Sequence, residues 1–358
     1  MSSKSSQGGQ GVERLLKISP VASVMNAGPV ELPPARAPSL AGLEVRVPRP
    51  EDLTQEDLIV RFHEKKRAVA SVRERALGEP VALGDDVQLD TVGYAAGKLI
   101  PFSARFGVWM ELAPIEALPG FAEGVAEGTV GGSVQLQLEL PEDYPVESLR
   151  GQPVRFIVDI RAAREVTPPD DSSPELLKKL GMGSSLDEVM QNIREELEDE
   201  LADQLWVQGR DMVLEEVARR AAPEVPRSLV DEEIRRRWAE AEGRAMVERD
   251  FDVEEQQEAL QAWLTDPSTR EEAERRLHLG LALKAVVEEA KLTLTPEKLE
   301  ELLTGQVEPF GLTRADVKQA LGESQKTARH LHDLAWHLLA VEYVMSKAKV
   351  IFEGAEEA

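Results

Sequence analysis

The sequence predicts an α+β protein in which a small antiparallel-sheet module is inserted into an extended all-helical body. Between Gly84 and Glu165, several stretches alternate apolar and polar residues, which is the period of a half-buried strand. From Pro174 onward, apolar residues recur at steps of three and four, which is the period of an amphipathic helix. At 358 residues the chain is also too long for one core of ordinary size.

Shifts in composition predict four segments. The first is a tail rich in Pro, Ala and Gly, whose four prolines between positions 29 and 38 stand too close together for a helix. A short strand and helix follow, then the sheet module, then the helical region. The predicted segments are 1–42 (disordered tail), 43–72 (linker strand and helix joined to the helical body), 73–168 (sheet module) and 169–358 (helical domain).

The linker segment begins with Leu43–Val47, which alternates as a strand does. Thr54 is placed to cap the helix that follows, because a hydroxyl at that position accepts a free backbone N–H of the first turn. Glu56 and Asp57 then lie near the positive end of the helix dipole. We expect this helix to end before Gly78.

Three strands and one short helix are predicted within the sheet module. The strands are residues 87–92, 134–140 and 154–160, and the helix is Phe121–Ala126, which follows a Pro-Gly pair. Several strands with a single short helix indicate an antiparallel α+β arrangement.

In the helical region, Ser185 and Glu188 have the spacing of a capping box at the start of a long helix. We expect Gly209 to interrupt that helix and Pro223 to end it. Thr295 followed by proline predicts the start of another helix, and a last long helix carries apolar residues from Leu331 to Met345.

The charge balance excludes several classes of partner. Lys plus Arg number 42 and Asp plus Glu number 66, which gives a net charge of −24. A field of this sign repels phosphate backbones and anionic lipid headgroups, so we expect neither nucleic acid nor membrane as a partner. The chain has no cysteine, which suits a reducing compartment, and we read no secretory signal and no membrane span. These features predict a cytoplasmic protein.

No motif indicates nucleophilic, metal or nucleotide chemistry. His330, Asp333 and His337 share one predicted helix face, where a metal could bind, but we interpret them as ordinary helical residues because no third imidazole joins them. There is no Gly-rich phosphate loop and no ordered Ser/His/Asp set. The sequence therefore predicts no cofactor and no metal, and any assistance to folding would be independent of ATP.

Three stretches resemble the trigger factor family, over roughly Leu43 to Val350. The first contains Leu118-Pro119-Gly120-Phe121 and Leu140-Pro141-Glu142-Asp143-Tyr144, and closes with Phe156. The second is the stretch Pro174–Gly181, and the third is Ala340–Val350. The resemblance implies an FKBP-like prolyl isomerase domain inserted in a helical chaperone domain. It departs from the family before Leu43, where the family's ribosome-docking domain has no counterpart.

Carried over by position, the resemblance implies a proline-binding cup. Phe121 is its floor, Leu118 a wall and a backbone donor, Tyr144 a rim hydroxyl, and Phe156 a second wall. Three further aromatics of the family are replaced at the substrate-binding positions, and an acidic residue by Pro101. The replaced aromatic positions are Thr91, Ile100 and Val108.

The expected chemistry is rotation about an X–Pro bond, whose barrier of ~18–20 kcal/mol comes from amide resonance. An apolar cup lowers that barrier by favouring the twisted amide, and needs no nucleophile or metal. The lost aromatics leave two functions open. One is an ATP-independent chaperone that binds unfolded or nascent polypeptides and has weak isomerase activity. The other is a non-catalytic peptide-binding or structural protein. In either case we expect no ribosome contact by the family's usual route.

Overall fold

A computed structural model of the chain describes residues 32–95, 98–100, 102–115, 118–142, 149–171, 173–221 and 224–353. These residues form two compact units. The sheet unit comprises the described residues of 52–200 and 234–266, and the helix unit comprises those of 32–51, 201–233 and 267–353. The predicted tail 1–42 lies largely outside the described residues, and the bounds of the four predicted segments stay predictions.

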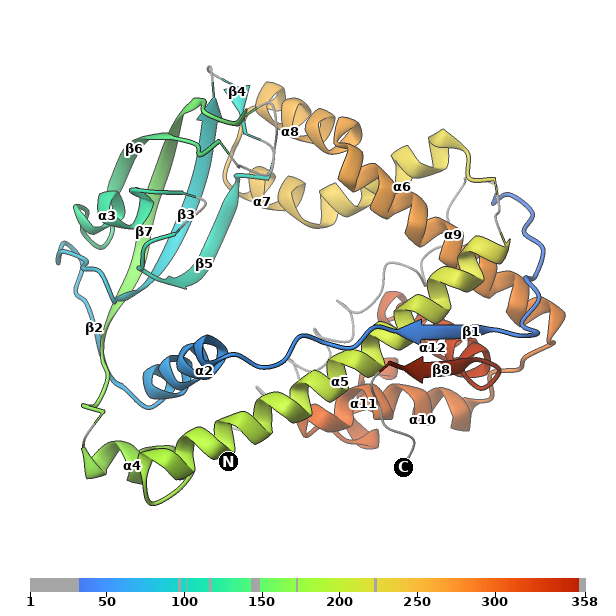
Figure 1. Cartoon of the computed structure of the whole chain (residues 1–358). Helices are drawn as coiled ribbons and strands as arrows, with labels where there is room; N and C mark the ends of the chain where they lie inside the picture. The colour runs from blue at the N-terminus through green and yellow to red at the C-terminus, as the bar shows by residue number, and fades with distance from the viewer. Residues whose placement is uncertain are drawn as a thin grey trace. The chain divides into compact units, whose positions relative to one another are not determined.

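The strands are labelled in Figure 1. They are β1 (Glu44–Val47), β2 (Ser71–Glu74), β3 (Asp86–Ala95), β4 (Lys98–Leu99), β5 (Arg105–Glu111), β6 (Ser133–Glu139), β7 (Pro153–Thr167) and β8 (Lys349–Phe352). The helices are α2 (Gln55–Ala68), α3 (Phe121–Ala126), α4 (Pro174–Leu180), α5 (Leu186–Ala221), α6 (Arg227–Glu240), α7 (Glu242–Glu248), α8 (Val253–Thr265), α9 (Pro267–Glu289), α10 (Pro296–Val307), α11 (Arg314–Glu323) and α12 (Gln325–Met345), with a short 3₁₀ turn at Glu308–Phe310.

The sheet unit is built on two long antiparallel strands, β3 and β7, which run side by side (Figure 1). β7 also pairs with β2 and β6, and β3 with β4 and β5, so six strands form one sheet. Apolar residues of alternate positions pack under α3 and form the core of this unit. The three predicted strands and the predicted helix Phe121–Ala126 are confirmed.

Strands β2 and β5 were not predicted. All four residues of β2 are exposed, so no apolar alternation marks it, and it is fixed by antiparallel pairing with the far end of β7. In β5 the alternation is broken by Gly107, whose φ of +64° suits a residue without a β-carbon. Neighbouring strands rather than local sequence therefore define both elements.

Helix α2 also belongs to the sheet unit. It begins with the predicted cap, because the Thr54 hydroxyl accepts the Asp57 N–H at 3.2 Å and the Asp57 carboxylate accepts the Thr54 N–H at 2.8 Å. Leu58 packs against Val189 and Ile193 of α5. The helix ends at Ala68, ten residues before Gly78, and β2 occupies the intervening stretch.

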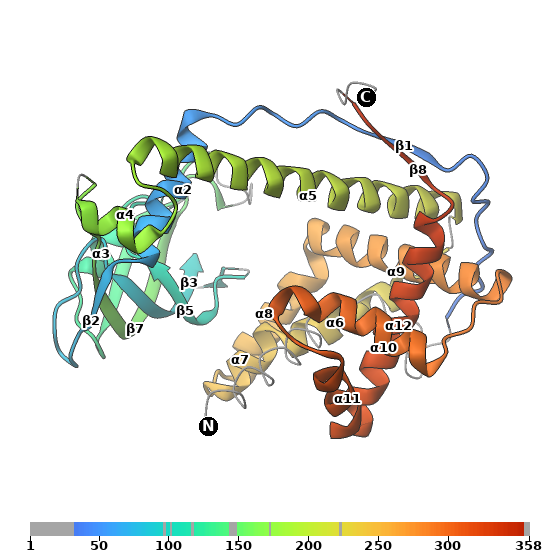
Figure 2. The same cartoon turned by 90° about the horizontal axis from the view of Figure 1, so that it is seen from below.

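Two predictions about the helical body are wrong. The body is not all-helical, because β1 and β8 of the helix unit lie side by side as a two-stranded parallel sheet (Figures 1 and 2). Gly209 does not interrupt α5, which continues through it to Ala221. A β-carbon at position 209 would lie 2.8 Å from Val350 Cγ1 and 3.1 Å from Val47 Cγ2. The glycine therefore lets the sheet approach the helix rather than breaking it. Pro223 lies outside the described residues.

The remaining helix starts agree with the sequence. Thr295 caps α10 by accepting the Lys298 N–H at 3.2 Å, and the last long helix is α12. Ser185 accepts the Glu188 N–H at 3.2 Å as predicted, although the Glu188 carboxylate returns its bond to Ser184. Within the described residues, none of the helices is both long and apolar enough to cross a bilayer.

His337 on α12 predicts acid sensitivity of the helix unit. Burial and the nearby Arg210 guanidinium lower the pKa of His337 to about 4 from its ordinary 6.5. The folded chain therefore binds fewer protons than the unfolded chain between pH 6.5 and 4, and stability falls as pH falls through that window. Between pH 7 and pH 5 we expect a loss of roughly 2 kcal/mol from this group.

The measurement is urea unfolding of the wild type and of His337→Gln at both pH values. The variant should lose less stability on acidification than the wild type, since its amide does not titrate. An identical loss in the two proteins would show that His337 does not carry the effect.

Candidate functional site

The centre of the candidate isomerase site is a pair of aromatic rings in the core of the sheet unit. Phe121 begins α3 and Phe156 lies on β7, and their ring centroids are 5.8 Å apart in an edge-to-face arrangement. Gly120, at φ +83°, turns the chain so that Phe121 points inward. The structure therefore brings together the predicted floor and second wall of the cup.

Ile100 and Leu118 join the same apolar cluster. Ile100 reaches Phe156 across Gly93, where a β-carbon would lie 2.7 Å from the Phe156 ring and 3.1 Å from Ile100 Cδ1. Leu118 packs against the cluster, but its backbone N–H already donates to the Ile115 carbonyl at 3.0 Å. It serves here as a wall rather than as a free donor.

Thr91 and Val108 lie on the same face of the sheet as the core, but neither belongs to the apolar cluster around the ring pair. Thr91 pairs with the buried Val158 and Val108 pairs with the buried Leu89, and directly paired residues of antiparallel strands share a face. The Thr91 hydroxyl donates to the Ser103 carbonyl at 3.3 Å, whereas Val108 is exposed. Tyr144 and Pro101 lie outside the described residues.

In this conformation the ring pair is covered. Phe121 is 4% exposed, Phe156 6% and Ile100 2%. A proline ring could reach the Phe121 face only if a neighbouring side chain moved. The arrangement offers apolar surroundings for a twisted amide, as isomerisation requires, but in a closed state.

Ser103 is a positioning residue that sequence reasoning missed. Its hydroxyl accepts the Gly93 N–H at 3.0 Å and lies 2.7 Å from the Ile100 carbonyl, to which it donates. The backbone N–H of Ile100 donates to the Gly93 carbonyl at 2.8 Å. These bonds hold Ile100 against β3. No sequence signal marks this serine, because its partners come together only through strand pairing.

A second candidate surface lies on the helix unit, around α5 and the β1–β8 sheet. Trp206 is 60% exposed and meets the Phe352 ring with 5.1 Å between centroids, and the next residue, Val207, is also exposed. Large apolar side chains exposed together on a surface mark a binding region more often than single ones do. We call Trp206, Val207 and Phe352 the Trp206 patch.

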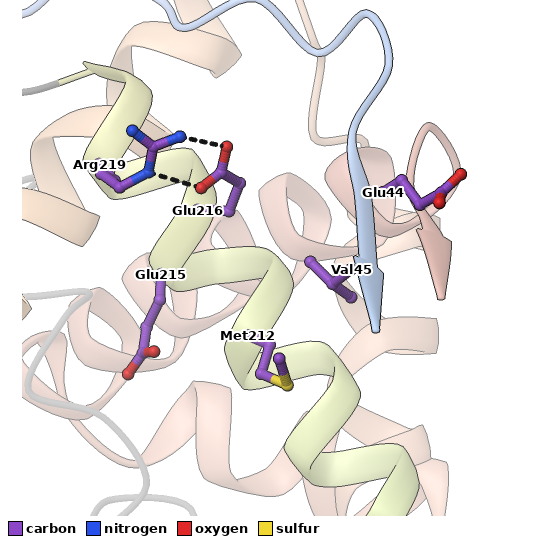
Figure 3. A pocket seen from close by; sticks show the side chains of 6 residues that line it. All are labelled: Glu44, Val45, Met212, Glu215, Glu216 and Arg219. Carbon is purple, nitrogen blue, oxygen red and sulfur yellow. Dashed lines mark hydrogen bonds and ion pairs between the residues drawn. The ribbon is translucent and has the colours of Figure 1, made fainter. Parts of the chain in front are cut away.

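An open pocket of about 370 Å³ lies between β1 and α5 in the same unit (Figure 3). Val45 and Met212 supply its apolar lining. At its rim, the Arg219 guanidinium contacts the Glu216 carboxylate at 2.7 Å, and together with Arg220 it lowers the pKa of Glu216 to about 2. The rim also includes Glu44 and Glu215, each of which has a cationic partner. The pocket thus combines an apolar lining with a rim of paired charges.

Comparisons with known proteins point to one family. The family model described as "Bacterial trigger factor protein (TF) C-terminus" matches residues 185–346. Curated relatives named trigger factor match most of this chain. That of Hydrogenovibrio crunogenus is 26% identical over 283 residues, covering 78% of this chain and 62% of the relative. That of Syntrophomonas wolfei is 24% identical over 338 residues, covering 90% and 73%. That of Listeria innocua is 27% identical over 311 residues, covering 84% and 70%.

A solved structure, described as "Promiscuous Substrate Recognition in Folding and Assembly Activities of the Trigger Factor Chaperone", is also similar. It shares 16% identity with a TM-score of 0.33, and the match covers 88% of this chain and 73% of that one. The chain spans 62% of the Hydrogenovibrio protein and 61% of the Psychromonas ingrahamii protein, so it matches only part of the length of these two relatives.

Proposed function

We propose that this chain, which is similar to trigger factors over most of its length, is an ATP-independent chaperone that binds unfolded polypeptides in the cytoplasm. The match of residues 185–346 to the family's C-terminal domain carries this proposal. The Trp206 patch and the pocket beside β1 support it, because apolar groups next to paired charges suit many weak, rapidly exchanged contacts. Neither nucleic acid, membrane nor ribosome is assigned as a partner.

The Trp206 patch predicts the effect of one substitution. In an aggregation assay with a chemically unfolded client and no nucleotide, the wild type should suppress light scattering at molar excess. Trp206→Ser should weaken the suppression several-fold, because burying an aromatic contributes ~1.5–3 kcal/mol to a contact. The readout is the chaperone-to-client ratio that halves the scattering.

Leu77→Ser is the matched control, since Leu77 is an exposed apolar residue of the sheet unit, outside the patch. It should suppress aggregation as the wild type does. Equal losses in both variants would mean that general surface hydrophobicity, not the Trp206 patch, holds the client. A wild type that leaves aggregation unchanged would refute the chaperone function itself.

We further propose that the sheet unit contains an FKBP-like module with weak prolyl isomerase activity. The Phe121–Phe156 pair supports this proposal, because both residues, together with Ile100 and Leu118, lie in one apolar cluster, and all four are assigned to the cup by the resemblance. Two features favour a low rate of prolyl isomerisation. The Phe121 and Phe156 rings are buried, and the family's aromatic residues are replaced by smaller ones at Thr91, Ile100 and Val108. A cis–trans assay on a proline-containing model peptide should show catalysis that Phe121→Leu reduces.

The second function, a non-catalytic peptide-binding or structural module, is favoured by one observation. The ring pair is buried as a core would be. Equal rates for the wild type, Phe121→Leu and buffer alone would select this alternative.

A further inference from the structure

Helices α7 and α8 belong to the sheet unit and lie next to Ile100, which shares the apolar cluster of the aromatic pair. We call residues 242–265, which contain both helices, the α7–α8 segment. They follow the sheet by more than 70 residues in sequence but belong to the same compact unit, and α8 contacts β4 directly. β4 ends at Leu99, so this contact lies immediately beside Ile100.

Aromatic contacts join the segment to the residues that follow Ile100. The Phe102 and Trp263 rings lie 5.1 Å apart between centroids, and the Phe106 and Phe251 rings lie 5.8 Å apart. The Arg249 guanidinium stacks over the Phe106 ring at 3.9 Å. Rings from the α7–α8 segment thus contact Phe102, which follows Ile100 closely, and Phe106, which lies at the start of β5.

Polar contacts fix the same segment to β3. The Tyr94 hydroxyl donates to the Glu255 carboxylate at 2.9 Å, and Tyr94 is the strand partner of Leu99. Arg249 donates to Asp90 at 3.3 Å. Although burial alone would raise the pKa of Asp90, the Gly107 amide and two guanidinium groups lower it, so this carboxylate stays charged.

Backbone strain indicates that these contacts hold the chain in place. Phe102 has a φ of +62°, which is costly for a residue with a β-carbon unless its surroundings impose it. Trp263 is a ring packed against Phe102, and its Nε1–H donates to the buried carboxylate of Glu242 at 2.7 Å. The Trp263 indole is therefore held in place within the α7–α8 segment, and it can support the strained Phe102.

We propose that the α7–α8 segment regulates the isomerase-like module by holding Ile100 over the Phe121–Phe156 pair. Ser103 links the α7–α8 segment to Ile100, because it is the neighbour of Phe102 and bonds to both Ile100 and Gly93. When the segment is docked, Ile100 stays in the cluster and proline is excluded. When it undocks, Phe102 relaxes and Ile100 is free to leave the ring pair. Trp263 is a positioning residue in this scheme, acting through Phe102. The regulatory role rests on the proposed isomerase function, whereas the docking itself does not.

The test combines hydrogen exchange with the isomerase assay on the full chain. The Ile100 N–H donates to the Gly93 carbonyl and the Gly93 N–H donates to the Ser103 hydroxyl. Exchange of these two amides therefore reports when Ile100 and Ser103 separate from β3. In Trp263→Ala these two amides should exchange about tenfold faster, and the isomerase rate should rise several-fold. Trp263→Phe, which keeps a ring against Phe102, should restore slow exchange. Tyr94→Phe removes one hydroxyl and should speed exchange about threefold in a fully folded protein.

Val253→Ala is the control, because Val253 is an exposed side chain at the start of α8, and its exchange pattern should match the wild type. Unchanged exchange at Ile100 in both Trp263→Ala and Tyr94→Phe would overturn the proposal, even if the wild type catalyses isomerisation. A rate that falls in Trp263→Ala would overturn the regulatory role too. Faster exchange without catalysis in any variant would support docking while refuting the isomerase function.

Discussion

Arg75→Ala is expected to destabilise the sheet unit by about 3–5 kcal/mol, because it leaves a buried carboxylate without its partner. Arg75 donates to both oxygens of Asp85, at 2.5 and 2.9 Å, and the Asp85 side chain is 4% exposed. Asp85 also accepts the Ala82 N–H at 2.8 Å, which fixes the turn before β3. Removing the guanidinium therefore leaves a buried charge uncompensated, and it also removes two hydrogen bonds to Asp85 and a third, of 3.0 Å, to Glu79.

Urea unfolding followed by far-ultraviolet circular dichroism measures this effect. The matched control is Arg73→Ala, since Arg73 is two residues away and pairs with Glu79 and Glu165 but is 56% exposed. Surface ion pairs contribute about 0–1 kcal/mol, so this change should cost little. Similar losses for the two variants would contradict the assignment of Arg75–Asp85 as a buried pair.

Phe121→Ala is expected to cost about 3–5 kcal/mol, the range for emptying a buried aromatic site. The edge-to-face contact with Phe156 adds to the loss, because such pairs contribute about 0.5–1.5 kcal/mol beyond burial. Phe121→Leu keeps most of the volume and should cost less than about 1.5 kcal/mol. The leucine variant therefore separates the contribution of the ring to stability from its proposed role in isomerisation.

Chemical denaturation of both variants checks the order of these costs. Phe310→Ala is a useful comparison, because Phe310 is an exposed phenylalanine of the helix unit and should lose little. If Phe121→Ala were as stable as Phe310→Ala, the ring would not be part of the core of the sheet unit.

Much of the fold follows from local sequence signals. Alternation predicts β3, β6 and β7, because alternate residues of each strand belong to the apolar cluster that also includes α3. Thr54 and Thr295 mark helix starts because a capping hydroxyl acts on its own first turn. The predictions that failed concern contacts between segments that are far apart in the sequence. β8 pairs in parallel with β1, some 300 residues earlier, and Gly209 is explained only by the strands packed on it.

In the candidate site, too, contacts between distant segments could not be predicted from the sequence. Four residues that the resemblance assigns to the cup, Phe121, Phe156, Leu118 and Ile100, lie in one apolar cluster, although only Phe156 stands on a strand that the sequence predicts. The resemblance does not reveal that the Ser103 hydroxyl donates to the Ile100 carbonyl. Nor does it indicate the α7–α8 segment, because Trp263 and Phe251 have ordinary helical surroundings in sequence. In the proposed scheme, contacts between segments distant in sequence decide whether a proline can reach the ring pair.

The most direct test of the chaperone function is site-specific photo-crosslinking to an unfolded client in the absence of nucleotide. The crosslinking amino acid p-benzoylphenylalanine replaces Trp206 in one protein and Leu77 in another. The account predicts that position 206 captures the unfolded client, that the folded form of the same client is not captured, and that position 77 captures neither. Equal capture at both positions, or none at position 206, would contradict it.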